Sequence, residues 1–328
     1  MLLFRRPELA VGYHKFSKVG KTVEQLTAEK LEARRNLRIS MNHASKNDLP
    51  LVLSAEDIAA PGWTDIRRKA HRFFSGKCSD IRLVGYARPP VSFMESVFQQ
   101  RLQSGGFSKG GFNVDILWPR YRDRFADFDS LFGREHVTLK VFDRNRLKDR
   151  NVVLDFGAEA GLDIDTASIV TANEGIGIGA ASLLYVQRRF GRGIDIGFHD
   201  AIRVNKAFIA KLSSLRSGKI HFSAKLVRPV IENNRDDLEW IENRLGYPIL
   251  DMREDEEGAR VISSEEDLIS VALDTLPALQ QLVPVNLDSG VNGLAAALDQ
   301  LLDETRNEVD VAMRGKMAKA LQKKPPRA

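Results

Sequence analysis

The sequence has one cysteine, no long apolar run and no histidine cluster, and each of these absences excludes a class of protein. Because Cys78 is alone among 328 residues, an internal disulfide and a metal site made of several cysteines are ruled out. The six histidines show no metal-ligand spacing and no G-x-S-x-G motif occurs, which weighs against zinc-hydrolase and serine-hydrolase chemistry. No apolar run approaches the roughly 20 residues that cross a bilayer, and the start M-L-L-F-R-R-P does not have the order of a signal peptide. We therefore expect a cytoplasmic protein that holds no metal.

The remaining composition is that of an ordinary globular protein. The chain is 43% hydrophobic and 28% charged, with a net charge of +5, and it is long enough to bury a full core. We expect an α/β domain over residues 1–284, followed over residues 285–328 by a C-terminal helix and a basic tail. Four leucines form one stripe of that helix, which can pack on the body or on a second copy: Leu294, Leu298, Leu301 and Leu302.

The basic tail raises nucleic acid as a partner. After Asp310 it carries six basic residues and no acid: Arg314, Lys316, Lys319, Lys323, Lys324 and Arg327. No aromatic residue is interleaved with them, and such a charge balance also serves plain solubility. Nucleic acid is therefore the least favoured partner.

The middle of the chain alternates short apolar runs with amphipathic segments. Residues 49–54, 81–86 and 137–142 are compact apolar runs, which predict strands, the first two of them buried. Helices are predicted over residues 91–102 and 121–132, and from residue 152 onward. Alternation of this kind predicts a parallel central sheet flanked by helices.

An arginine stands where the second predicted strand ends. Arg88 is followed by two prolines and then by the helix, whose second turn carries Ser96. An arginine fork beside helix N-terminal amides makes a site for an anion such as a phosphate group. The alternative is an ordinary strand–turn–helix in which Arg88 forms a surface ion pair.

A carboxylate follows the first predicted strand. The run ends in S-A-E-D, where Ser54 is expected to cap a helix and Glu56 to stand in its first turn. Glu56 is either a capping-box acid or a residue that lines a cleft at the carboxyl edge of the sheet, where ligands of open α/β sheets bind.

Two segments resemble phosphate-binding loops only in part. Residues 15–22, K-F-S-K-V-G-K-T, lack the first glycine and the preceding strand of a Walker A loop. Residues 175–180, G-I-G-I-G-A, match a dinucleotide fingerprint with Asp195 at the right distance. Polar residues precede that pattern where a buried strand should run, so neither interpretation is favoured.

With these motifs in place, the segment V-G-Y-A-R-P-P-V-S-F-M-E-S at residues 84–96 can be compared with a family. It resembles the 3′-phosphate-binding segment of bacterial sulfotransferase-like proteins that use 3′-phosphoadenosine-5′-phosphosulfate (PAPS). Further landmarks follow in the family's order over roughly residues 25–250: L-S-A-E-D at 53–57, Y-R-D-R-F at 121–125, F-G-x-E-x-V-x-L-x-x-F-D-R at 132–144, N-V-V-L-D-F at 151–156 and A-N-E at 172–174.

The resemblance implies a P-loop sulfotransferase fold with PAPS as the sulfuryl donor. Arg88 and Ser96 would bind its 3′-phosphate, and the acceptor would be a hydroxyl of a saccharide or another small molecule. Glu56 is the candidate general base and His14 a second candidate.

This sequence departs from the family pattern at one landmark. Sulfotransferases have a phosphosulfate loop of the type H-x-G-x-x-K-T-G-T-T before these segments, and we expect this chain to lack it. The alternative is that residues 12–22, G-Y-H-K-F-S-K-V-G-K-T, are a distorted form with His14 and Lys15 in that role. A catalytically degenerate protein that binds a partner or glycan is therefore the alternative to an active enzyme.

Overall fold

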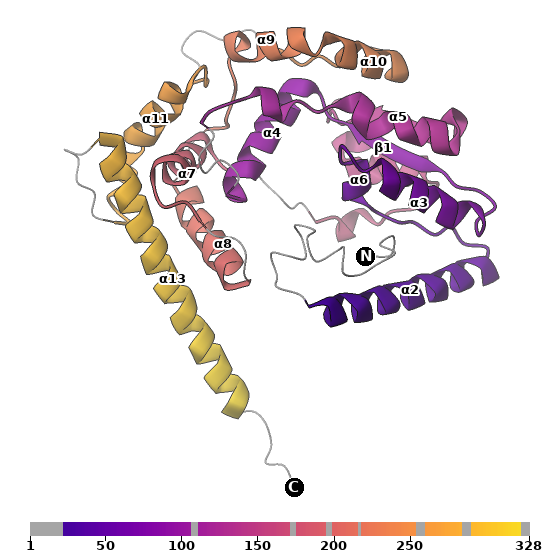
Figure 1. Cartoon of the computed structure of the whole chain (residues 1–328), viewed down its shortest axis with the longest axis horizontal. Coiled ribbons are helices and arrows are strands. Elements are labelled where there is room, and N and C mark those ends of the chain that lie inside the picture. The colour runs from indigo at the N-terminus through magenta and orange to yellow at the C-terminus, as the bar shows by residue number, and fades with distance from the viewer. Residues whose placement is uncertain are drawn as a thin grey trace. The chain divides into compact units, whose positions relative to one another are not determined.

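The computed structural model describes residues 22–105, 111–170, 175–194, 199–215, 218–253, 260–283 and 290–322 (Figure 1). The chain is mostly helical, at 65% helix, with a small parallel sheet of two strands and a long C-terminal helix. Among the helices of these residues, none is long and apolar enough to cross a membrane. The parallel sheet flanked by helices that the sequence predicts is thus much smaller than expected.

The chain divides into two compact units that interleave along the sequence. The first unit contains residues 1–90, 119–170 and 231–251, and the second contains residues 91–118, 171–230 and 252–328. The boundary that the sequence predicts near Pro284 lies outside the described residues.

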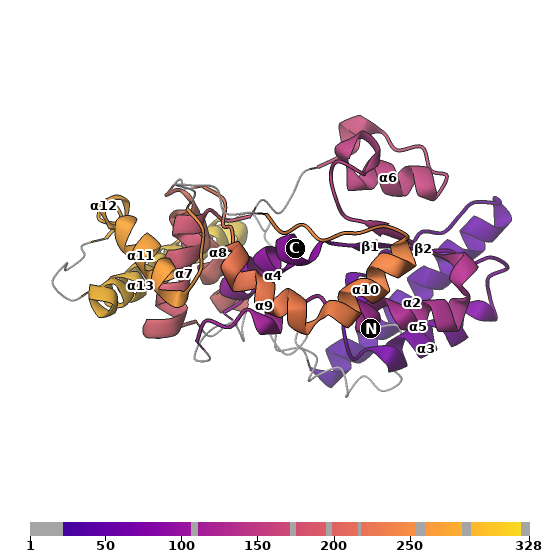
Figure 2. The same ribbon diagram turned by 90° about the horizontal axis from the view of Figure 1, so that it is seen from above.

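The first unit is built around strands β1 (Leu83–Ala87) and β2 (Val137–Val141). They pair in parallel (Figure 2), with Leu83 opposite Val137 and Ala87 opposite Val141. Five α-helices belong to this unit: α2 (Val23–Lys46), α3 (Thr64–Ser75), α5 (Tyr121–Phe132), α6 (Val152–Glu159) and α10 (Arg235–Leu245). Its short 3₁₀ helices are η2 (Glu56–Ala59), η4 (Arg134–His136), η5 (Lys148–Arg150) and η6 (Thr166–Ser168).

The predicted strand at residues 49–54 is wrong. These residues form no regular element, and the apolar side chains of Leu49, Leu51, Val52 and Leu53 are between 39% and 53% exposed. A strand is stable only when its backbone groups pair with a neighbouring strand, and this run pairs with neither β1 nor β2. The second predicted strand does form, as β1, but its first four residues are half-buried rather than buried.

Helix α5 has the bounds that the sequence predicts. Its apolar stripe of Tyr121, Phe125 and Phe128 is buried, and it ends at Gly133, which has φ 87°. A positive φ at a helix end favours glycine, because a Cβ there clashes with the following backbone.

A buried arginine joins helix α3 to α5. The Arg67 guanidinium is fully buried and donates to the carbonyl oxygens of Ile58, Ala60 and Asp123 and to the Asp127 carboxylate, over 2.7–2.9 Å. Because every one of these bonds is charge-assisted, the pair of helices is fixed in position.

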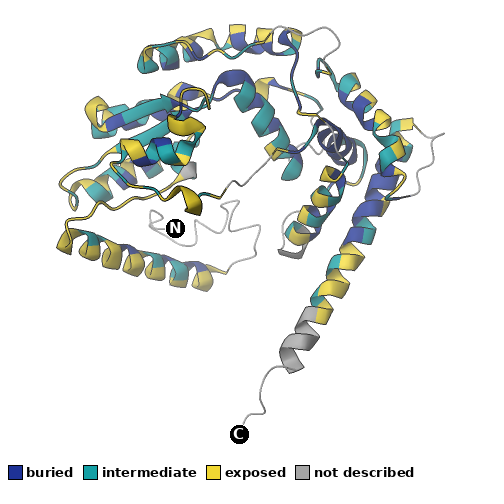
Figure 3. Ribbon diagram, turned by 180° about the vertical axis from the view of Figure 1, so that it is seen from behind, coloured by how far each residue is buried: buried dark blue, intermediate teal, exposed yellow. Residues whose placement is uncertain are grey.

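The second unit has helix α7 (Ile178–Phe190) at its centre. Every residue from Ile178 to Arg188 is buried (Figure 3), and the helix packs against α8 (His199–Ser213), α11 (Glu265–Asp274) and α13 (Gly290–Gln322). Helices α4 (Pro90–Gln103), α9 (Ala224–Asn233) and α12 (Leu276–Leu279) and the 3₁₀ helix η3 (Asp115–Leu117) complete it.

Polar side chains are paired inside this helical core. The Arg188 guanidinium, 1% exposed, donates to the side chains of Gln187 and Asn205, and burial lowers its pKa to about 10. The Gln187 amide donates in turn to Asp299 of α13. The predicted C-terminal helix is confirmed, and its leucine stripe is buried within this unit: Leu294, Leu298, Leu301 and Leu302.

Candidate functional site

Arg88 lies at the carboxyl edge of the two-stranded sheet. It directly follows β1, and Phe142 directly follows β2 with its N–H bonded to the Ala87 carbonyl at 2.8 Å. The Tyr121 hydroxyl donates to the Arg88 carbonyl at 2.6 Å, and the guanidinium carbon lies 5.8 Å from the centre of the Phe142 ring. Burial is the main cause of the raised pKa of Tyr121, so this hydroxyl keeps its proton and remains a donor. The backbone of Arg88 is therefore fixed at the strand end, where α/β proteins bind ligands.

An ion-paired cluster lies next to Arg88. The Tyr86 ring stands edge-on to that of Phe142, with 6.5 Å between centres. Its hydroxyl donates to Asp155 at 3.2 Å, and Lys140 Nζ lies 2.6 Å from the same carboxylate. Burial acts to raise the pKa of Asp155, but the hydrogen bonds from Lys140 and from the Lys148 N–H outweigh it and the pKa is lowered. Lys140 is thus shared between two carboxylates, because its Nζ also lies 3.5 Å from Glu159.

Ser96 belongs to the second unit and stands on the second turn of α4, where it is half-buried. Beside it on the helix, the Glu95 carboxylate accepts the Phe222 N–H at 3.0 Å and lies 3.4 Å from His221 Nδ1. Sequence reasoning missed this Glu95–His221 pair, because 126 residues separate the two side chains. A carboxylate that orients an imidazole is an arrangement used for proton transfer and also a common structural pair.

The side chains of the two candidate base residues lie outside the part of the chain that the structure describes. Glu56 is the first residue of η2, and its side chain, like the whole of His14, lies outside the described residues. Ser54 does not cap this element, since the N-cap position is Ala55 and no side chain bonds to it. The helix start predicted at Ser54 is therefore wrong: residues 56–59 make one 3₁₀ turn instead.

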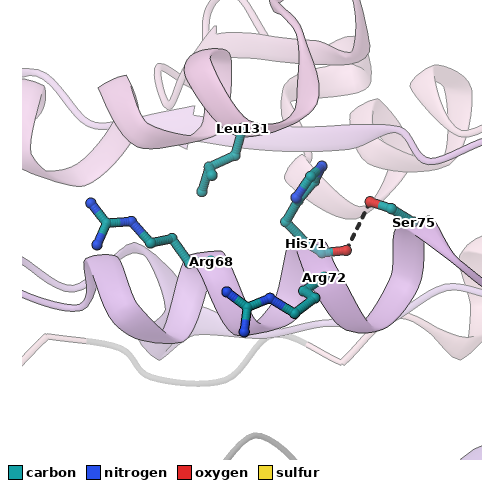
Figure 4. Close-up of a pocket in the computed structure, with 5 residues that line it drawn as sticks. All are labelled: Arg68, His71, Arg72, Ser75 and Leu131. Carbon is teal, nitrogen blue, oxygen red and sulfur yellow. Dashed lines mark hydrogen bonds between the residues drawn. The ribbon is translucent and has the colours of Figure 1, made fainter.

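A pocket of about 510 Å³ lies between α3 and α5 (Figure 4). Four of its lining residues come from α3, and Leu131 comes from α5: Arg68, His71, Arg72, Ser75 and Leu131. The sequence gives a signal for it, since arginines four residues apart on a helix share one face. The sequence does not show which neighbour would close a pocket.

Comparison with known proteins gives no family. No family model, no curated protein and no solved structure matches the chain. Among the residues that the structure describes, no group of three or more potential metal ligands occurs. The function of the chain is therefore inferred from its own residues.

Proposed function

We propose that the chain is a sulfotransferase-like protein that binds a 3′-phosphoadenosine nucleotide through Arg88 and Ser96. The sulfuryl donor would be PAPS, and the acceptor a hydroxyl of a saccharide or another small molecule. The single observation that carries the proposal is the placement of Arg88 at the carboxyl edge of a parallel strand pair, its carbonyl held by Tyr121.

Two features support an anion at Arg88. The arginine directly follows β1, and only Pro89 separates it from the first residue of α4. Its guanidinium carbon lies 5.8 Å from the centre of the Phe142 ring, and an arginine fork matches the geometry of phosphate oxygens.

The transfer itself would need a base and cationic stabilisation. In it the acceptor oxygen forms a bond to sulfur while the bond from sulfur to the 5′-phosphate oxygen breaks, and 3′,5′-adenosine bisphosphate leaves. The hydroxyl proton passes to a general base, for which Glu56 is the first candidate and His14 the second. These two roles rest on the sequence resemblance.

Calorimetry with 3′,5′-adenosine bisphosphate tests the binding half of the proposal. We expect Arg88→Ala to weaken binding roughly tenfold or more, because a charge-assisted phosphate contact contributes about 1.5–3 kcal/mol. Ser96→Ala should have a smaller effect. The matched control is Arg82→Ala, an arginine just before β1 whose side chain is 78% exposed and pairs with Asp80.

Adenosine 5′-monophosphate provides a second control, because it lacks the 3′-phosphate. Its binding should be the same in wild type and Arg88→Ala. Equal binding of the bisphosphate to both proteins, or binding to neither, would refute the assignment. Nucleotide binding without sulfuryl transfer to a panel of hydroxyl acceptors would favour the degenerate protein that binds a partner or glycan.

A further inference from the structure

The pocket between α3 and α5 combines cationic groups with an apolar wall. In Figure 4 the side chains of Arg68 and Arg72 both lean toward the N-terminal end of α3, and Leu131 points from α5 toward Arg68. The Ser75 hydroxyl donates to the His71 carbonyl at 2.8 Å. The His71 ring stands edge-on to Phe132, with 4.9 Å between centres. The pocket is an open hollow at the surface, and three of its lining residues, Arg68, Arg72 and Ser75, are exposed.

The two walls of the pocket are held rigidly. Arg67 precedes Arg68 on α3 and bonds to the Asp123 carbonyl and the Asp127 carboxylate, both on α5. Thr64, in the first turn of α3, also donates to Asp127, at 2.6 Å. Because these bonds fix α3 against α5, the guanidinium groups start from a preorganised backbone, which reduces the entropy that binding must offset.

The described residues compensate the charge of the pocket only in part, and the charge of Arg68 also helps to lower the pKa of Asp127 on α5. Among the described residues, Arg68 pairs only with Asp65, at 3.7 Å and with both side chains more than half exposed, and Arg72 has no acidic partner. An exposed pair of this kind contributes little and is easily exchanged for another anion. Two arginines one helical turn apart therefore present a positive site beside an apolar surface.

We propose that this pocket binds a monoester of phosphate or sulfate that carries an aromatic or alkyl group. Arg68 and Arg72 bind the anionic oxygens, since a guanidinium fork matches the geometry of such groups. Leu131 and the aliphatic stems of the arginines contact the apolar part of the ligand. The site is separate from Arg88 and does not depend on the function proposed above.

Titration calorimetry with 4-nitrophenyl phosphate and 4-nitrophenyl sulfate tests the pocket and separates the two ester types. We expect Arg68→Ala and Arg72→Ala each to weaken binding roughly tenfold. Arg38→Ala, an exposed arginine on α2 outside the pocket, is the matched control and should bind as wild type does. Leu131→Ala should weaken the nitrophenyl esters but leave inorganic phosphate binding unchanged.

Each result has a defined meaning. Failure of both esters to bind, or equal losses in Arg38→Ala and Arg72→Ala, would overturn the proposal. If inorganic phosphate bound as tightly as the esters, the proposed apolar contact with Leu131 and the arginine stems would be wrong. Arg88→Ala should leave ester binding at Arg68 and Arg72 unchanged, so the failure of one proposed site is distinguishable from failure of the other.

Discussion

Replacement of Arg67 by methionine gives the sharpest test of how the first unit is held together. The methionine keeps much of the volume and apolar stem but removes the donors. Three carbonyl oxygens, those of Ile58, Ala60 and Asp123, then lose a charge-assisted bond, and Asp127 loses its buried partner. We expect the free energy of unfolding to fall substantially, because buried acceptors left without donors lose their solvation as well as their bonds.

The size of the effect follows from burial. Breaking a buried ion pair costs about 3–5 kcal/mol. The Asp127 side chain is 32% exposed and keeps its bond from Thr64, so water can partly replace the arginine. We therefore expect the free energy of unfolding to fall by the lower end of this range, about 3 kcal/mol. This is a large part of the roughly 5–15 kcal/mol that stabilises a typical domain.

Urea unfolding followed by tryptophan fluorescence measures this effect. Two of the three tryptophans, Trp63 and Trp240, lie in the first unit, so the signal reports mainly on it. With a typical slope of about 2 kcal/mol per molar urea, the midpoint should fall by about 1.5 M. The control Arg68→Met changes the next residue, whose side chain is 60% exposed, and should shift the midpoint little. Similar midpoints for the two variants would refute the structural role of Arg67.

Two further predictions concern the same unit. Hydrogen bonding from Thr64 is the largest cause of the lowered pKa of Asp127. A carboxyl whose pKa is lowered by folding stabilises the protein above its unfolded pKa of about 3.9, and this stabilisation is lost as the pH falls. In urea titrations, Asp127→Asn should therefore be less stable than wild type at about pH 7. Near about pH 3 the two proteins should be closer in stability. Gly246 and Gly76 both end helices and both have open space where an added Cβ would lie, but only Gly246 has a positive φ, 83° against −89°. Gly246→Ala should therefore lower the thermal midpoint by the equivalent of about 1 kcal/mol while Gly76→Ala does not lower it; equal effects would contradict the role of φ.

Local patterns predict the elements around Arg88 well. The strand expected at residues 81–86 is β1, Leu83–Ala87, and the helix expected at residues 91–102 is α4, Pro90–Gln103, which begins at the second proline. Both signals are encoded in neighbouring residues: β-branched and aromatic side chains for the strand, prolines and a repeated apolar spacing for the helix. The pairing of β1 with β2 is also as expected for alternating strands and helices.

The number of strands is not encoded locally. Residues 49–54 have a composition typical of a buried strand, yet they form none, because a strand also needs a partner and a covering layer. The same limit applies to Glu95 and His221, which approach each other only through the packing of distant segments. Whether Arg88 and Ser96 bind a nucleotide stays a prediction, since spacing in a sequence specifies residue types and leaves the ligand to experiment.

In helix α3 the helical periodicity distinguishes a buried arginine from exposed ones, which the charge pattern alone does not do. Arg67, Arg68 and Arg72 look alike in a basic segment, but at about 100° per residue Arg67 falls on the same face as Ala70 and Phe74. Ala70 is 2% exposed, so that face is the packed one, and an arginine on it must find acceptors inside the protein. Arg68 and Arg72 fall on the adjacent face with Ser75 and stay in solvent. One arginine therefore fixes the helix while its neighbours remain available to an anion, and the two roles can be removed separately by mutation.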